Sequence, residues 1–161
     1  MKKSRKITLS AIFCSLVAVC TLLQIPTVAG YINLGDVAIL VSACLIGNLG
    51  ILSASIGAGL IDILTGYSIY LPATIIIKGL MAFICSKILH KKSNKLFKYI
   101  IIFIICEIVM IIGYFLYEIF VFDIGYAVSG LLYNCIQGAI AVVGSSVSMF
   151  FINKSKFMER M

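Results

Sequence analysis

The sequence is poor in charge: 12% of its residues are Asp, Glu, Lys or Arg, against about 25% in typical soluble domains. Apolar residues make up 62%, and the mean hydropathy is +1.16. So little charge excludes a soluble globular domain and predicts an integral membrane protein. At 161 residues, one domain (1–161) is expected, with no room for an additional ATPase or soluble enzyme domain.

Motifs for chemistry are also missing. There is no Gly-x-x-x-x-Gly-Lys-Ser/Thr nucleotide-binding loop, and the single histidine, His90, lies in a polar connection. The six cysteines all fall in apolar segments without a C-x-x-C pair, so they are interpreted as small buried hydrophobes, and neither a metal site nor a disulfide framework is expected. No catalytic residue and no cofactor is predicted. An intramembrane aspartyl protease would need Gly before Leu34-Gly35-Asp36, where the chain has Asn33.

Positive charge is gathered in three clusters outside the apolar segments. They comprise Lys2, Lys3, Arg5 and Lys6; His90, Lys91, Lys92, Lys95 and Lys98; and Lys154, Lys156 and Arg160. Basic residues that flank membrane helices mark the cytoplasmic side, so both termini are expected there. This placement accounts for the net charge of +7 without nucleic-acid binding.

The hydrophobic pattern predicts an all-α bundle of six transmembrane helices. Their expected ranges are 7–24, 37–47, 51–66, 69–89, 97–117 and 127–152. The N-terminal apolar run is interpreted as the first helix and not as a cleaved signal peptide, because it is long and lacks a cleavage site. Residues 37–66 are either two short crossings that turn near Gly47–Gly50 or one re-entrant hairpin, since the flanking basic clusters require an even number of crossings.

Residues 30–36 form the first polar interruption, after Pro26 has ended the first helix. The sequence Gly-Tyr-Ile-Asn-Leu-Gly-Asp supplies an aromatic ring, an amide and a carboxylate, and no Lys or Arg lies near it. A polar loop at a membrane face that contains an acid but no basic residue is typical of a ligand-binding segment. Asp36 has an alternative role, because a carboxylate directly before a helix starting at Val37 can cap it.

Ionisable residues inside a membrane are costly and are usually functional. On the fifth predicted helix, Glu107, Tyr114 and Glu118 fall within about 20° of one line, and Tyr126, Tyr133 and Gln137 do the same on the sixth. An outward-opening polar cavity is therefore predicted. Its expected substrate-binding residues are Tyr31, Asn33, Asp36, Asp62, Tyr70, Lys78, Tyr114, Glu118, Tyr133, Asn134 and Gln137.

Structural roles for the same residues remain open. Lys78 can pair with Asp62 or Glu118 to hold helices together, and tyrosines near helix ends are common at membrane interfaces. Glu107 lies deeper than the other acids and is placed outside the binding set, as a helix–helix hydrogen-bonding group. Because acids outnumber Lys78, an anionic ligand is disfavoured and a neutral or cationic heterocycle is favoured.

The first predicted helix carries small residues four positions apart, including Ala11 and Ser15. Such faces let another helix approach closely in lipid. They serve either packing within this chain or docking to a separate subunit.

Four blocks carry a resemblance to a known family. These are Pro26 with Gly30–Asp36, then Asp62-Ile63-Leu64-Thr65-Gly66-Tyr67, then Pro72, and then Ile76-Ile77-Lys78-Gly79-Leu80. In order and spacing they resemble the membrane-embedded substrate-binding (S) components of energy-coupling factor (ECF) vitamin transporters, in the branch with riboflavin-, pyridoxine- and hydroxymethylpyrimidine-type members. The resemblance covers the first ~90 residues, and the last two helices match in character only.

The resemblance implies a six-helix bundle in the plasma membrane of a prokaryote, with a vitamin site near the outer surface that is closed by the loop 27–36. It implies a transmembrane scaffold subunit and two ATP-hydrolysing subunits as partners, with Ala11 and Ser15 at the scaffold contact. Relatives often carry Trp before Pro72, where this chain has Tyr70. A pyridoxine-like or hydroxymethylpyrimidine-like substrate is favoured, and riboflavin or a queuosine precursor stays open. The alternatives are a ligand-free accessory membrane subunit and a small intramembrane enzyme.

Overall fold

The computed structural model describes residues 3–28, 30–90 and 96–155, and within them the chain is almost wholly helical. The elements are α1 (Lys3–Leu22), β1 (Gln24–Pro26), β2 (Tyr31–Asn33), α2 (Gly35–Ile46), α3 (Leu49–Leu64), the 3-10 turn η1 (Ser68–Tyr70), α4 (Leu71–Leu89), α5 (Leu96–Val121) and α6 (Ile124–Lys154). Four stretches are long and apolar enough to cross a membrane: Ser4–Leu22, Ser68–Leu89, Leu96–Val121 and Ile124–Lys154. With the shorter apolar helices α2 and α3, they make the chain a helical, multi-pass membrane protein, as the sequence predicts.

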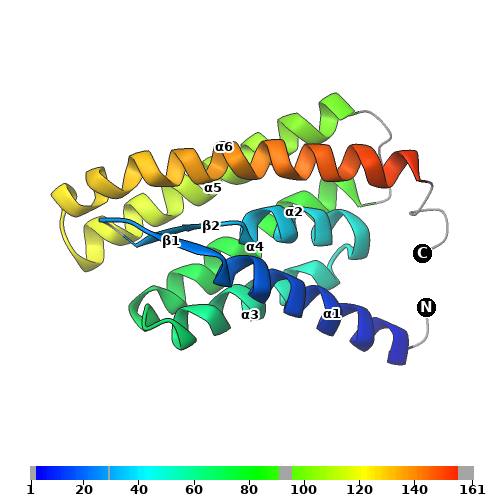
Figure 1. Ribbon diagram of the computed structural model, residues 1–161, viewed down its shortest axis with the longest axis horizontal. Coiled ribbons are helices and arrows are strands. Elements are labelled where there is room, and N and C mark those ends of the chain that lie inside the picture. The colour runs from blue at the N-terminus through cyan, green and yellow to red at the C-terminus, as the bar shows by residue number, and fades with distance from the viewer. Residues whose placement is uncertain (1–2, 29, 91–95, 156–161) are drawn as a thin grey trace.

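The helices run back and forth along the long axis of the molecule (Figure 1). The strands β1 and β2, the connection from α3 to α4 and the connection from α5 to α6 lie at one end of the bundle. The turn from α2 to α3 lies toward the other end, where α1 begins and α6 finishes. Residues of the hairpin, of η1 and of the helices that lead to this end are therefore close enough to build one site.

Two features differ from the sequence prediction. Residues 24–33, expected to be the end of a helix followed by a loop, form an antiparallel hairpin in which Gln24 pairs with Asn33 and Pro26 with Tyr31. The hairpin closes through a hydrogen bond from the Thr27 N–H to the Gly30 carbonyl, and Gly30 has the positive φ of +85° that glycine tolerates. The second difference is in the helix limits, which lie within four residues of those expected; the largest shifts are at the start of α1, at Lys3, and at the end of α5, at Val121.

Helix α2 is the centre of the bundle. It packs against α1, α3, α4 and α6, and all its residues except Val37 are buried. A helix that is apolar on every side is typical of such a position. Because α2 is enclosed by protein along its length, its 12 residues need not match the thickness of the lipid.

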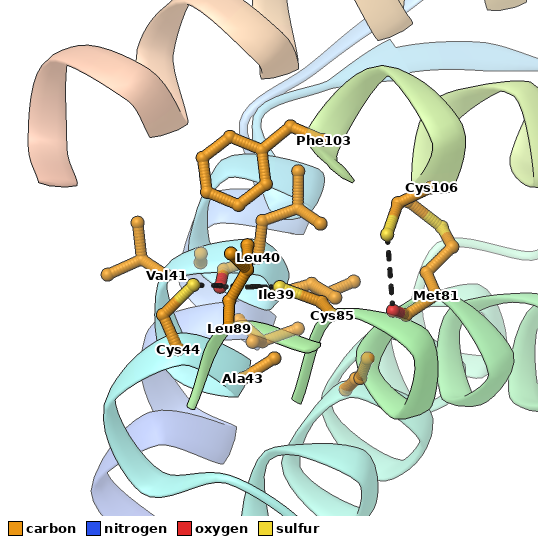
Figure 2. Close-up of a cluster of buried hydrophobic side chains, with 14 of the residues drawn as sticks. Ile39, Leu40, Val41, Ala43, Cys44, Met81, Cys85, Leu89, Phe103 and Cys106 are labelled. Carbon is orange, nitrogen blue, oxygen red and sulfur yellow. Dashed lines mark hydrogen bonds between the residues drawn. The ribbon is translucent and has the colours of Figure 1, made fainter. Parts of the chain in front are cut away.

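The part of the core around Cys44, Cys85 and Cys106 is built from aliphatic residues and cysteine thiols (Figure 2). Cys44 on α2 and Cys85 on α4 lie with their sulfur atoms 3.6 Å apart, and the Cys106 thiol on α5 donates to the carbonyl of Met81 at 3.5 Å. Phe103 closes the cluster from α5. These three cysteines pack as small apolar side chains that let α2, α4 and α5 approach one another.

Candidate functional site

A cavity lies beneath the hairpin, at the end of the bundle opposite the described termini (Figure 1). Its wall consists of Thr21, Gly30, Tyr31, Asn33, Ala58, Asp62, Tyr70, Thr74, Lys78, Tyr114, Glu118, Asn134 and Gln137. The cavity volume is about 40 Å³, and one water molecule needs about 10–15 Å³. It has room for a few waters, so a heterocyclic ligand enters only when the hairpin or the side chains around it move.

A buried ion pair forms the floor of the site. The Lys78 ammonium on α4 lies 2.6 Å from Asp36 Oδ1 on α2, and both side chains are almost inaccessible to solvent, at 4% and 0% exposure. Gln137 on α6 donates from Nε2 to Asp36 Oδ2 at 2.6 Å. One carboxylate thus links α2, α4 and α6, and it neutralises Lys78.

Two alternatives weighed from the sequence are therefore wrong. Lys78 pairs with Asp36 and not with Asp62 or Glu118. Asp36 is no helix cap: α2 already begins at Gly35, and the side chain turns inward to Lys78. Instead, the Asn33 side-chain oxygen accepts the Gly35 N–H at 2.7 Å, which satisfies a free donor at the start of α2.

The second strand of the hairpin is fastened to two helices. The Asn33 N–H donates to Gln137 Oε1 at 2.9 Å, and the Tyr31 hydroxyl donates to Asp62 Oδ1 on α3. Burial, and then the neighbouring Asp62 carboxylate, raise the pKa of Tyr31, so this phenol stays protonated and donates. The Leu34 N–H also donates to the Cys20 carbonyl at 3.2 Å, which ties the hairpin to α1.

The hairpin contacts give a first testable prediction. Gln137→Ala leaves the Asn33 N–H and Asp36 Oδ2 without their partner, and each unsatisfied buried group costs about 1–3 kcal/mol. We expect lower thermal stability and at least about tenfold faster amide hydrogen exchange over residues 24–34, since about 1.4 kcal/mol corresponds to tenfold. Ser148→Ala is the matched control on α6, because among the described residues the Ser148 hydroxyl bonds only to the Gly144 carbonyl of the same helix. Unchanged exchange in Gln137→Ala would show that the hairpin is held by other contacts.

Aromatic side chains make the other walls. Tyr70 donates its hydroxyl to Glu118 Oε1 at 3.3 Å and also lies 3.1 Å from the Tyr126 hydroxyl. Tyr114 pairs with the Thr74 hydroxyl at 3.0 Å, and Lys78 Nζ lies 5.2 Å from the centre of its ring. Tyrosine therefore holds both remaining acids of the cavity: Tyr31 bonds Asp62, and Tyr70 bonds Glu118.

Nine of the eleven residues predicted from the sequence line this cavity. Asp36 lies behind the wall, where it holds Lys78, and Tyr133 is not among the lining residues. Four lining residues were not in the predicted set: Thr21, Gly30, Ala58 and Thr74. Thr74 was the easiest of these to find, because it lies one helical turn from Lys78.

Glu107 lies outside the cavity, on the side of α5 that faces α6. It lines an apolar groove between these helices, and the absence of a side chain on Gly138 gives its carboxyl room. Neither of its oxygens has a hydrogen-bond partner among the described residues. The interpretation of Glu107 as a helix–helix hydrogen-bonding group therefore finds no bond there, and its exclusion from the binding set agrees with its position.

The small residues of α1 divide between two faces. Ala11 and Ser15 are exposed. Cys14 lies against α3, where a side chain on Gly57 would come within 2.7 Å of the Cys14 carbonyl oxygen. The Cys14 face is thus used for packing within the bundle. The face with Ala11 and Ser15 is not covered by other described residues of the chain.

This fold and this site define a class: a multi-pass membrane protein with a small polar cavity under a hairpin at one end. The family model described as ECF-type riboflavin transporter, S component, matches residues 1–153. The chain therefore belongs to this family of vitamin-transport subunits and is a transport component, not an enzyme. Membership implies a small-molecule vitamin substrate and the partners of an ECF module. A search of curated proteins found no match.

Proposed function

We propose that this chain captures a small vitamin or vitamin precursor from outside a prokaryotic cell and delivers it to an ATP-driven ECF complex. The observation that carries the proposal is the polar, tyrosine-lined cavity beneath the hairpin. The candidate substrates are a pyridoxine-like or hydroxymethylpyrimidine-like compound, with riboflavin and a queuosine precursor as further candidates. ATP hydrolysis belongs to two separate subunits, and a transmembrane scaffold subunit joins them to this chain.

The topology proposed with this function has six crossings and both termini in the cytoplasm. The family match and the three basic clusters support it, because such clusters flank the cytoplasmic ends of membrane helices. In this orientation the hairpin faces outward. Loop 27–36 then acts as the closure of the site, and Tyr31 and Asn33 become ligand contacts when it closes.

Binding is proposed to involve the eleven residues predicted from the sequence, with Asp36 and Lys78 acting from below as a brace. A ligand would occupy this cavity and exchange hydrogen bonds with the amides of Asn134 and Gln137. The tyrosine rings offer flat apolar surface for stacking against a heterocycle.

The experiment that tests the function is affinity purification of the tagged chain from its native membrane in mild detergent. Mass spectrometry then identifies every protein and small molecule retained. We expect a larger membrane subunit, two ATPases and a small heterocycle in one complex. A chain that is isolated without protein partners and without a small molecule would contradict the proposal.

The exposed face of α1 gives a second prediction. Ala11→Phe or Ser15→Phe puts a ring where two helices are proposed to meet, and small-xxx-small contacts do not accommodate one. We expect scaffold retention in the purification to fall at least about tenfold, a loss of about 1.4 kcal/mol. Ile112→Phe is the matched control, because Ile112 is 51% exposed on α5, away from α1. Normal scaffold retention by both α1 variants would place the docking surface elsewhere.

A further inference from the structure

The charges around the cavity do not cancel. Asp36, Asp62 and Glu118 contribute three carboxyl groups, and Lys78 is the single Lys or Arg among the residues that line the cavity. The formal sum is −3 + 1 = −2. Asp36 lies 2.6 Å from Lys78 and forms an ion pair with it. Asp62 and Glu118 are therefore the two acids without a basic partner of their own.

Both uncompensated acids have one oxygen left for a ligand. Asp62 is 0% exposed and Glu118 is 2% exposed. Asp62 accepts the Tyr31 hydroxyl and also interacts with the Thr74 hydroxyl, and Glu118 accepts the Tyr70 hydroxyl. Asp62 Oδ2 and Glu118 Oε2 meet no hydrogen-bond partner of good geometry among the described residues. The Thr21 hydroxyl in the same wall is likewise unpartnered within the described chain. A buried carboxyl without a partner is unfavourable, so a bound group that donates hydrogen bonds or brings positive charge stabilises this arrangement.

The aromatic walls favour the same chemistry. The rings of Tyr31, Tyr70 and Tyr114 line the cavity, and the centres of the Tyr70 and Tyr114 rings lie 6.2 Å apart. Aromatic faces attract cations, and the attraction grows when water is excluded. Lys78 already uses the Tyr114 ring in this way, at 5.2 Å. An anionic group would instead meet two unpaired acids and a lysine whose charge is already neutralised.

We infer that the ligand of this cavity is an organic cation of net positive charge: a small heteroaromatic ring that carries an ammonium or amidinium group. The positive group lies between Asp62 and Glu118, and the ring lies against the tyrosines. This inference rests on the proposed function, because it names the substrate class of the same site. The inference distinguishes between the candidate substrates. Riboflavin is uncharged, whereas amine-bearing pyridines and aminopyrimidines can take up a proton.

The test uses purified wild-type protein in lipid nanodiscs and a series with one ring and three charges. Pyridoxamine carries an ammonium group where pyridoxine carries a hydroxyl and 4-pyridoxate a carboxylate. A second pair is 4-amino-5-hydroxymethyl-2-methylpyrimidine and its 4-hydroxy analogue, with riboflavin as a neutral comparison. We expect the amine-bearing member of a series to bind at least about tenfold more tightly than its neutral analogue. Tighter binding of pyridoxine, 4-pyridoxate or riboflavin would overturn the inference.

Two variants locate the charge preference. Asp62→Asn and Glu118→Gln keep the shape of each side chain, and each is expected to reduce the preference for the amine at least about tenfold. Glu107→Gln is the matched control, because it removes an equally buried acid outside the cavity and should leave the preference unchanged. An unchanged preference in both cavity variants would contradict the inference, and the wild-type series decides the question if a variant fails to fold.

Failure of the inference can be told from failure of the function. If no probe binds, the small molecule retained from the native membrane is identified, and a neutral or anionic compound overturns the charge assignment. Retention of the scaffold and ATPases together with such a compound would leave the transport function intact. A cation retained without any protein partner would support the charge assignment and contradict the transport complex.

Discussion

Asp36→Asn is expected to lower the free energy of unfolding by about 3–5 kcal/mol, the usual cost of removing one partner of a buried ion pair. Asn keeps the size of the side chain but leaves the Lys78 ammonium without a counter-charge in a site that is 4% exposed. The second bond of Asp36, from Gln137 Nε2, would also weaken. The measurement is thermal unfolding in detergent, followed by the loss of monodisperse protein in size-exclusion chromatography.

The control for this prediction removes both charges. Asp36→Asn combined with Lys78→Met eliminates the unpaired ammonium, and replacing a buried pair by neutral groups is often nearly neutral for stability. We expect the double variant to recover most of the stability that Asp36→Asn loses. A double variant no more stable than Asp36→Asn would mean that packing around Asp36, and not its charge, supports the bundle.

The second large effect is expected at Gly57, where α3 meets α1. A Cβ added there would lie 2.7 Å from the Cys14 carbonyl oxygen and 3.0 Å from the Cβ of Val17, which is fully buried. Alanine favours helix over glycine by about 1 kcal/mol, yet we expect Gly57→Ala to destabilise by about 1–3 kcal/mol, because overpacking forces α1 away from α3. The same thermal assay measures it.

The neighbouring residue provides the comparison for Gly57. Ile56 is 57% exposed on the same helix, so Ile56→Ala removes a side chain that lies mostly outside the packed core. Its effect is expected to stay within about 0.5 kcal/mol, as for most surface substitutions. If Gly57→Ala proved as stable as the parent, α1 would have to be free to shift. The α1–α3 contact would then not fix the position of the face that carries Ala11 and Ser15.

Hydrophobic pattern and charge placement were sufficient to predict the helical bundle and the end at which the cavity lies. The spacing of Tyr114 and Glu118 on one face of α5 also predicted their place in the cavity wall, since helical periodicity fixes which residues share a face. The hairpin was missed because its strands have three residues each and one contains Pro26, too short for a periodic signal.

The partner of Lys78 could not be chosen from the sequence. Three acids were available, and the choice depends on the register of α2 against α4, which joins residues 42 positions apart. Asp36 looked like a helix cap because the apolar run begins at Val37, whereas the helix itself starts at Gly35. Thr21 was missed because it lies on the first helix, whose small residues drew attention to packing.

The unequal lengths of the helices have a consequence for the surrounding membrane. At about 1.5 Å per residue, the 16 residues of α3 span about 24 Å, short of a hydrocarbon core of about 30 Å. Unlike α2, α3 presents large side chains outward, including Leu52, Ile56 and Leu64. If α3 is one of the proposed crossings, the bilayer beside it must become thinner, at a cost of fractions of a kcal/mol for each ångström of mismatch.

This thinned lipid would lie next to α1, because α3 packs along that helix. A protein that covers the α1–α3 side would replace this thinned lipid, which would return to a bilayer of normal thickness. The deformation energy released would favour the association. Association on this side would then strengthen in thicker membranes and weaken in thinner ones, even with every protein contact unchanged. The strength of assembly would therefore depend on bilayer thickness, because α3 is about four residues too short to span the hydrocarbon core.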